Sequence, residues 1–148
     1  MTPFTFNTTP SLRMGAGLAS QLGDIVKPIC GDNILFVTDP GMVATGLVAP
    51  VIESLRAVGI MVRVFDQVQA DPPEAVILQA AYMARNVSGV VGFGGGSSLD
   101  VAKLAALLAA SEQPLTEAYG IGNAAGPRLP LVLVPTTSGT GSEGTPIS

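Results

Sequence analysis

Two glycine-rich segments hold the residues whose types and spacing suit chemistry with a phosphate group. The first, residues 92–103, reads GFGGGSSLDVAK, and the second, residues 135–143, reads PTTSGTGSE. Each follows a short apolar run that predicts a buried β-strand, and the first continues directly into a helical pattern. Glycine leaves backbone N–H groups uncovered, and the N-terminus of a helix directs the positive end of its dipole at an anion. The two segments therefore predict a nucleotide-binding site.

The first loop supplies the candidate pyrophosphate-binding residues Gly94, Gly95, Gly96 and Ser97. Open α/β sheets bind ligands at the carboxyl ends of their strands, which is where this loop falls. The alternative is a tight turn in which Ser97 caps the following helix. Three successive glycines exceed the needs of a turn, and this favours phosphate binding. The loop is not the usual dinucleotide fingerprint, because Leu99 stands where the third glycine belongs.

Three charged residues are candidates for the same site. Asp39 ends the first predicted strand, where its carboxylate can accept both hydroxyls of an adenosine ribose and repel a 2′-phosphate; alternatively, it only caps the next helix. Asp100 and Lys103 lie three residues apart, just after the loop. Either Lys103 brings charge toward the phosphates, or the two residues form a local ion pair in which Asp100 complements the helix dipole. The sequence leaves these alternatives open.

The second segment is rich in short hydroxyl side chains, which suit hydrogen bonds to a ribose, an adenine edge or a phosphate. These side chains are Thr136, Thr137, Ser138, Thr140 and Ser142. Any one of them is also compatible with a polar loop of self-capping turns. Clustered around glycines, together they favour a ligand site.

The chain lacks the residues of a complete reaction centre. It has no histidine and one cysteine, Cys30, which excludes an internal disulfide, a Ser–His pair and a transition-metal site built from this chain alone. With no base to activate it, Cys30 is expected to be a buried structural thiol. No catalytic residue can be assigned from the sequence.

Strand and helix patterns alternate along the chain and position these candidates. Apolar runs at 33–38, 60–65, 87–93 and 131–134 predict strands, and helical spacing predicts helices around 47–55, 72–84 and 98–110. Asp71 is expected to cap the second of these helices, ahead of Pro72 and Pro73. Repeated strand–helix units require parallel strands with right-handed crossovers. The fold class is therefore α/β, a doubly wound parallel sheet that is Rossmann-like.

Composition bounds the remaining possibilities. The 148 residues predict one domain, 1–148, with 47% hydrophobic and only 12% charged residues. The helix at 99–110 is apolar nearly all round, so we expect a second domain or a further subunit to cover it, and the protein to be a homo-oligomer. The net charge of −4 gives no footprint for nucleic acid, and no run approaches the length of a membrane span. We expect a cytoplasmic protein that acts on small molecules, and the abrupt end at 144–148 suggests a fragment.

The two segments, in this order, closely resemble the two signatures of the iron-containing (group III) alcohol dehydrogenase family. The stretch Val37–Gly41 is also similar to the ribose-binding segment of that family. The resemblance runs over essentially the whole chain. Two positions depart from the family pattern: Asp71 stands where an asparagine is frequent, and Ser88-Gly89 stands where an acidic residue is usual.

The resemblance implies an NAD(P)-binding, dehydroquinate synthase-like N-terminal domain, followed in the family by a helical domain that holds a divalent metal, usually iron or zinc. It implies that Gly94–Ser97 bind the pyrophosphate, that Thr136, Thr137 and Thr140 lie along the cofactor, and that Asp39 favours NAD over NADP. The implied activity is hydride transfer between an alcohol or carbonyl substrate and nicotinamide, with the metal ligands absent from this chain. This chain alone is then expected to be inactive.

Several alternatives remain beside the alcohol dehydrogenase. Maleylacetate reductases and hydroxyacid–oxoacid transhydrogenases resemble the same family. Dehydroquinate synthase-like cyclases use a similar glycine loop, with NAD as a recycled cofactor. A non-catalytic nucleotide-binding module is a further possibility, in which the apolar helix packs against a partner.

Overall fold

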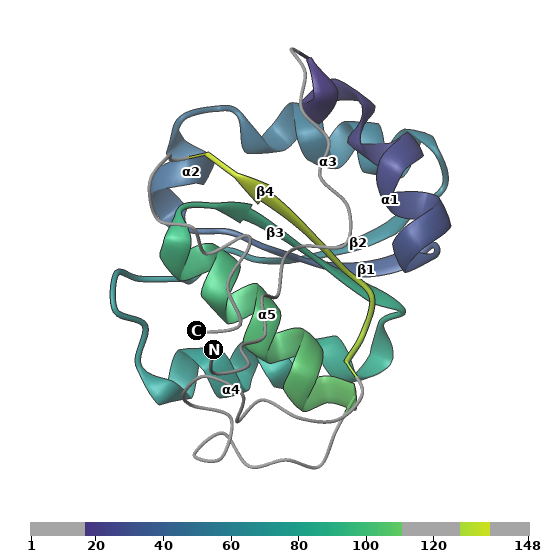
Figure 1. Ribbon diagram of the computed structural model, residues 1–148. Helices are drawn as coiled ribbons and strands as arrows, with labels where there is room; N and C mark the ends of the chain where they lie inside the picture. Colours follow the sequence, from purple (N-terminus) through teal and green to yellow (C-terminus); the bar gives the residue numbers. More distant parts are fainter. Residues whose placement is uncertain (1–16, 111–127, 137–148) are drawn as a thin grey trace, which may run out of the picture.

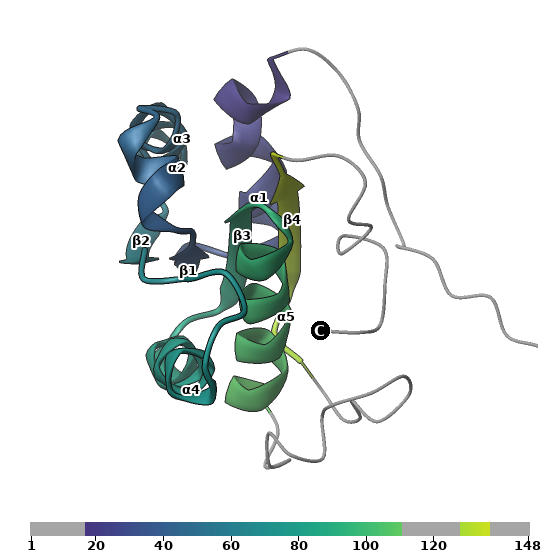
Figure 2. The same ribbon diagram turned by 90° about the vertical axis from the view of Figure 1, so that its left-hand side faces the viewer.

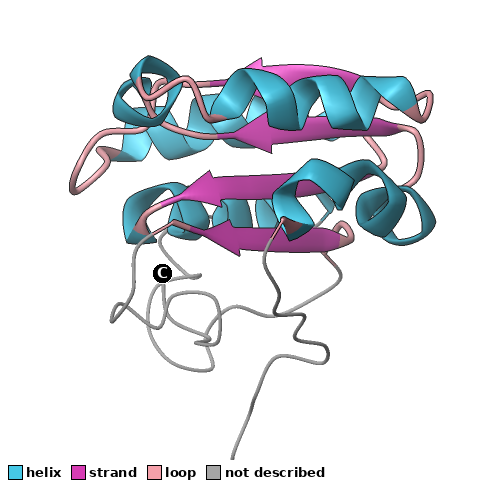
Figure 3. Ribbon diagram, turned by 90° about the horizontal axis from the view of Figure 1, so that it is seen from above, coloured by secondary structure: helices cyan, strands magenta, loops and turns pink. Residues whose placement is uncertain are grey.

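The computed structural model describes residues 17–110 and 128–136, and its centre is a parallel β-sheet. In this part of the chain the sheet has four strands in the order β2-β1-β3-β4, and every neighbouring pair is parallel. The strands are β1 (Asn33–Val37), β2 (Met61–Phe65), β3 (Gly89–Gly94) and β4 (Leu131–Pro135). Figure 3 shows all four arrows pointing the same way. The predicted parallel sheet is confirmed, with strands close to their expected bounds.

Helices cover both faces of the sheet (Figures 1 and 2). On one face lie α1 (Leu22–Cys30), α2 (Pro40–Ala44) and α3 (Val48–Ala57), preceded by the 3₁₀ turn η1 (Leu18–Gln21). On the other lie α4 (Glu74–Met83) and α5 (Gly96–Ala110), with the 3₁₀ turn η2 (Ala84–Asn86) after α4. The domain is therefore a doubly wound, Rossmann-like α/β fold, as the alternating patterns predicted.

The side chains of the central strands alternate between two hydrophobic cores. In β1, Leu35 and Val37 belong to the core beneath α4 and α5. Ile34 and Phe36 belong to the core beneath α1 and α3. All four are completely buried, because successive side chains of a strand point to opposite faces and both faces are covered. This explains why the strand sequences are continuously apolar.

The expected start of α4 at Asp71 is wrong. The helix begins at Glu74 with Pro73 in the N-cap position, and no side chain caps it. Pro73 disfavours the helical region for the residue before it, so the helix cannot start as early as Pro72. Asp71 instead takes a φ of +47° outside the helix.

The expectation that something beyond this domain must cover α5 is also corrected. Most of the helix is buried, and it contacts β3, β4 and α4 of the same chain. Close approach makes this possible: a Cβ built on Gly92 of β3 would lie 2.8 Å from the Cβ of Ala102. Small residues on helix and strand therefore let one α-helix bury most of its surface between the sheet and α4.

Candidate nucleotide-binding site

The candidate site lies at the carboxyl edge of the sheet, between β1 and β3. These two strands are neighbours, with Val37 paired to Gly92. From β1 the chain continues through α2 and α3 on one face, whereas from β3 it continues through α5 on the other face. In open α/β sheets a ligand crevice forms where successive connections leave in opposite directions. The sequence of β1 and β3 thus brings Asp39 and the glycine loop to this crevice.

Gly94 makes the turn from β3 into α5, and its conformation requires glycine. Its φ is +147°, which side chains rarely allow. A Cβ there would lie 3.0 Å from Ser98 Oγ and 3.1 Å from Asp39 Oδ2. Because nothing but hydrogen occupies this position, the backbone after β3 can turn at once into the first turn of α5.

Ser97 does not cap α5, so the alternative interpretation of this residue is wrong. The helix already begins at Gly96, and Leu99 N donates to Gly95 O at 3.1 Å. The first N–H groups of any α-helix have no acceptor within the helix. In α5 these groups belong to the glycine loop and its two serines, which is a suitable donor set for an anion.

Asp39 caps α2, which was one of the two roles that the sequence left open, and the ribose contact remains a prediction. Its Oδ1 accepts a hydrogen bond from Met42 N at 2.9 Å and so caps α2, while its Oδ2 accepts one from Ser98 Oγ at 3.1 Å. An ionised carboxylate offers about four acceptor positions on its two oxygens. Capping α2 therefore leaves acceptor capacity for a ligand hydroxyl.

Asp100 and Lys103 form the local ion pair. Lys103 Nζ lies 3.6 Å from Asp100 Oδ1, and their side chains are 10% and 30% exposed. The spacing of three residues along one helix face places the two groups within reach. The ion pair is therefore confirmed, but α5 begins at Gly96 and has no acidic residue in its first turn, so Asp100 does not have the predicted place beside the end of the helix dipole. A contact from Asp100 to a cofactor remains a prediction.

The end of β4 closes the site from the other side. Thr136 N donates to Gly94 O at 2.9 Å, and Thr136 Oγ1 donates to Met42 Sδ at 3.5 Å. Thr136 therefore lies between the glycine loop and α2, and its contact with a cofactor remains a prediction. Thr137 and Thr140 lie outside the described residues.

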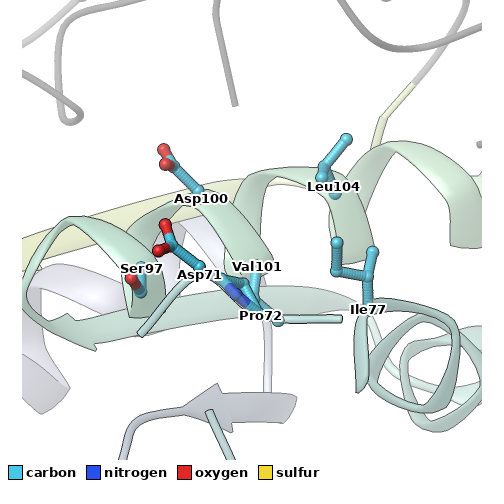
Figure 4. A pocket seen from close by; sticks show the side chains of 7 residues that line it. All are labelled: Asp71, Pro72, Ile77, Ser97, Asp100, Val101 and Leu104. Carbon is cyan, nitrogen blue, oxygen red and sulfur yellow. The ribbon is translucent and has the colours of Figure 1, made fainter. Parts of the chain in front are cut away.

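A pocket that sequence reasoning missed adjoins the site (Figure 4). Its volume is about 330 Å³, and its lining residues are Asp71, Pro72, Ile77, Ser97, Asp100, Val101 and Leu104. Figure 4 shows Ser97 and the carboxylates of Asp71 and Asp100 toward one end, with Leu104 of α5 and Ile77 of α4 toward the other. The sequence did indicate a place for Asp71 near the site, because Asp71 follows β2 and the loop after any parallel strand lies at the carboxyl edge of the sheet. Its apparent role as a helix cap concealed it.

Cys30 lies at the opposite edge of the sheet and takes no part in this site. Its Sγ is 3.7 Å from Pro130 O and 4.0 Å from Val90 O, at the starts of β4 and β3. The side chain is 1% exposed, and desolvation by burial raises its pKa to about 11. A thiol that stays protonated is a poor nucleophile, so Cys30 is the structural residue that the sequence predicted.

The described residues hold no metal site of their own. Among residues 17–110 and 128–136, no three His, Cys, Asp or Glu side chains lie close enough to bind one ion together. In the same ranges no helix is long and apolar enough to cross a membrane.

The fold is a Rossmann-like α/β domain with a glycine turn at its candidate ligand crevice. The model of one family, "Iron-containing alcohol dehydrogenase", matches residues 9–148. The chain belongs to the iron-containing alcohol dehydrogenase family, as the two glycine-rich segments indicated.

Relatives and a solved structure agree with this assignment. The chain is 37% identical over 147 residues to sulfoacetaldehyde reductase of Bilophila wadsworthia, covering 98% of this chain and 38% of that protein. It is 42% identical over 147 residues to long-chain-alcohol dehydrogenase 1 of Geobacillus thermodenitrificans, covering 94% of this chain and 36% of that protein. The crystal structure of sulfoacetaldehyde reductase from Bifidobacterium kashiwanohense in complex with NAD+ superposes with a TM-score of 0.81 at 28% identity, covering 97% of this chain and 38% of that one. The chain thus spans less than two fifths of the length of these relatives.

Proposed function

We propose that this chain binds NAD and is the cofactor-binding part of a metal-containing alcohol dehydrogenase. The reaction is hydride transfer between a small alcohol or carbonyl substrate and the nicotinamide. The observation that carries the proposal is the turn at Gly94, which exposes the start of α5 directly beside Asp39. Membership of the family and the NAD+ complex of a relative support it.

The described residues fit the cofactor. Gly94, Gly95, Gly96 and Ser97 supply backbone N–H groups for the pyrophosphate at the positive end of α5. Asp39 accepts hydrogen bonds from the adenosine ribose, and its negative charge disfavours the 2′-phosphate of NADP. Thr136, with Thr137 and Thr140 beyond the described residues, completes the binding surface, and Asp100 lies at the site end of α5.

The described residues do not fit the metal, so we derive no catalytic step through it. We propose that an iron or zinc ion would be held by groups outside the described residues and would supply a Lewis acid for the substrate oxygen. The 148-residue chain is then expected to bind cofactor without turning over alcohols.

The first test is a titration of the 148-residue chain with NADH and with NADPH, followed by the fluorescence of the bound nicotinamide. Asp39→Asn is the informative variant, because asparagine can still cap α2 while the negative charge is lost. We expect the wild type to prefer NADH, and Asp39→Asn to reduce this preference about tenfold, comparable to the loss of one charge-assisted hydrogen bond. Asp24→Asn is the matched control, since it removes the same charge from an exposed residue in the first turn of α1.

Two results would contradict the proposal. If neither NADH nor NADPH binds the folded wild-type chain, the site is not a dinucleotide site. If Asp39→Asn and Asp24→Asn change the cofactor preference equally, Asp39 does not contact the ribose. A separate assay with NAD, short alcohols and added iron or zinc tests inactivity, and NADH formation above the blank would show that the chain holds a reaction centre.

A further inference from the structure

One hydrogen bond joins two elements of the site that lie far apart in the sequence. Ser98 Oγ, on the first turn of α5, donates to Asp39 Oδ2 at the end of β1 over 3.1 Å. Ser98 is 1% exposed, although a buried hydroxyl is costly unless it has a partner. The bond therefore satisfies a serine that would otherwise be unfavourable at this position.

The geometry around Asp39 leaves its carboxylate little freedom. One oxygen is bound by Met42 N at 2.9 Å and the other by Ser98, so donors from two different elements hold the two oxygens. Gly94 packs against the same group, since a Cβ on it would lie 3.1 Å from Asp39 Oδ2. The α2 cap alone fixes one oxygen and allows the carboxylate to pivot about it. Only the second bond, from Ser98, defines where the remaining acceptor positions point.

The two adjacent serines of α5 have different surroundings. Ser97 lines the pocket beside α4, whereas Ser98 is buried and turned toward β1. Successive residues of an α-helix point about 100° apart, so the two hydroxyls cannot serve the same group. Ser97 is placed to meet a ligand, and Ser98 is placed to hold a residue that meets it.

We infer that Ser98 is a positioning residue that orients the Asp39 carboxylate and thereby sets the preference of the site for NAD over NADP. This inference rests on the proposed function and adds a residue that touches no cofactor. With Ser98 in place, the carboxylate keeps its acceptor positions toward the ribose and its charge where a 2′-phosphate would lie. Without the Ser98 hydroxyl, the carboxylate pivots about its bond to Met42 N, which weakens the ribose contact and relieves the repulsion of the phosphate.

The test compares NADH and NADPH dissociation constants for wild type, Ser98→Ala and Ser98→Thr. We expect Ser98→Ala to weaken NADH binding about threefold to tenfold and to leave NADPH binding unchanged or tighter, since one hydrogen bond to a charged group is lost. Ser98→Thr keeps the hydroxyl and is expected to retain the NADH preference. Ser54→Ala is the matched control, because it removes another serine hydroxyl that donates one hydrogen bond, in this case to the backbone oxygen Val51 O in α3.

A double-mutant cycle separates positioning from a general effect on folding. In an Asp39→Ala background there is no carboxylate to orient, so adding Ser98→Ala should leave the NADH-to-NADPH ratio unchanged. Thermal unfolding of each variant identifies any that is not folded at the titration temperature.

The outcomes distinguish this inference from the proposed function. A wild type that prefers NADH, together with a Ser98→Ala variant of unchanged preference, overturns the role of Ser98 and leaves the proposed function standing. An equal effect of Ser98→Ala with and without Asp39 also overturns it. A folded wild type that binds neither nucleotide overturns both.

Discussion

Replacing Gly94 with alanine perturbs the feature on which the candidate site depends. The φ of +147° is strained for any residue with a side chain, at a cost of about 1–3 kcal/mol. The new Cβ would also meet Ser98 Oγ at 3.0 Å and Asp39 Oδ2 at 3.1 Å, which forces apart two groups that are hydrogen-bonded to each other. Losing that bond adds about 1 kcal/mol. We therefore expect Gly94→Ala to lower the free energy of unfolding by roughly 2–4 kcal/mol.

Gly59→Ala is the control that isolates the steric part of this effect. Gly59 also has a positive φ, of +87°, but a Cβ there would meet only the end of the flexible Lys27 side chain, at 3.4 Å. We expect Gly59→Ala to cost about 1 kcal/mol, from backbone strain alone. Both free energies come from urea unfolding followed by far-ultraviolet circular dichroism.

The same pair of variants tests the binding site. Gly94→Ala that remains folded should bind NADH at least tenfold more weakly than wild type, because the displaced backbone no longer presents its N–H groups and Asp39 together. Gly59→Ala should bind NADH like wild type. Equal losses of stability in the two variants would refute the steric reasoning, and full NADH affinity in Gly94→Ala would refute the assignment of the turn to cofactor binding.

Three further predictions follow from other contacts. Asp71→Asn removes a carboxylate from the pocket that also contains Asp100, so we expect titration to show NADH binding a few-fold more tightly. Thermal stability should not fall, because asparagine tolerates the φ of +47°. An increase in NADH affinity no larger than that of Asp24→Asn would contradict this prediction. Gly89→Ala would place a Cβ 2.8 Å from the Cα of Cys30. Urea unfolding should therefore show a free energy of unfolding that is about 2–4 kcal/mol lower than in wild type. A decrease below about 1 kcal/mol would show that α1 moves aside easily. Burial raises the pKa of Cys30 from 9.0 to about 11, so as pH rises the thiol loses its proton in the unfolded chain before it does in the folded one. The free energy of unfolding should therefore fall as pH rises from about 9 to 11. Over that range the difference in this free energy between wild type and Cys30→Ala should shrink, and a constant difference would contradict the burial argument.

Much of the fold was predictable because its signals are local. A buried strand, a helix start and a glycine turn each occupy a few consecutive residues, so the apolar run 33–38 and the glycines at 94–96 indicated β1 and the turn into α5 directly. The parallel arrangement followed as well, since alternating strands and helices can pair in few other ways. For the same reason the carboxyl edge of the sheet, with Asp39 and Gly94–Ser97, could be predicted as the candidate site.

The predictions from sequence were wrong at two places, the start of α4 and the covering of α5. The Asp-Pro-Pro-Glu stretch has the composition of a helix start, yet the second proline delays the helix to Glu74 and frees Asp71 to line the pocket. The apolar surface of α5 suggested a missing partner, whereas Gly92 and Ala102 bring this helix so close to β3 that the chain buries it by itself. Sequence patterns show how apolar a segment is, but they do not show how near its neighbours come.

The sequence by itself determined the class of the domain, the family to which it belongs and the identity of the residues at the ligand edge, because these depend on residue type and local spacing. Only the tertiary structure decided which of those residues form hydrogen bonds with one another. Asp39 and Ser98 are separated by 59 positions, yet their hydrogen bond decides how the carboxylate points. The pairing of β1 with β3 and the packing of α5 bring these two residues together in space. A contact that depends on the packing of many residues cannot be recognised in any short stretch of sequence.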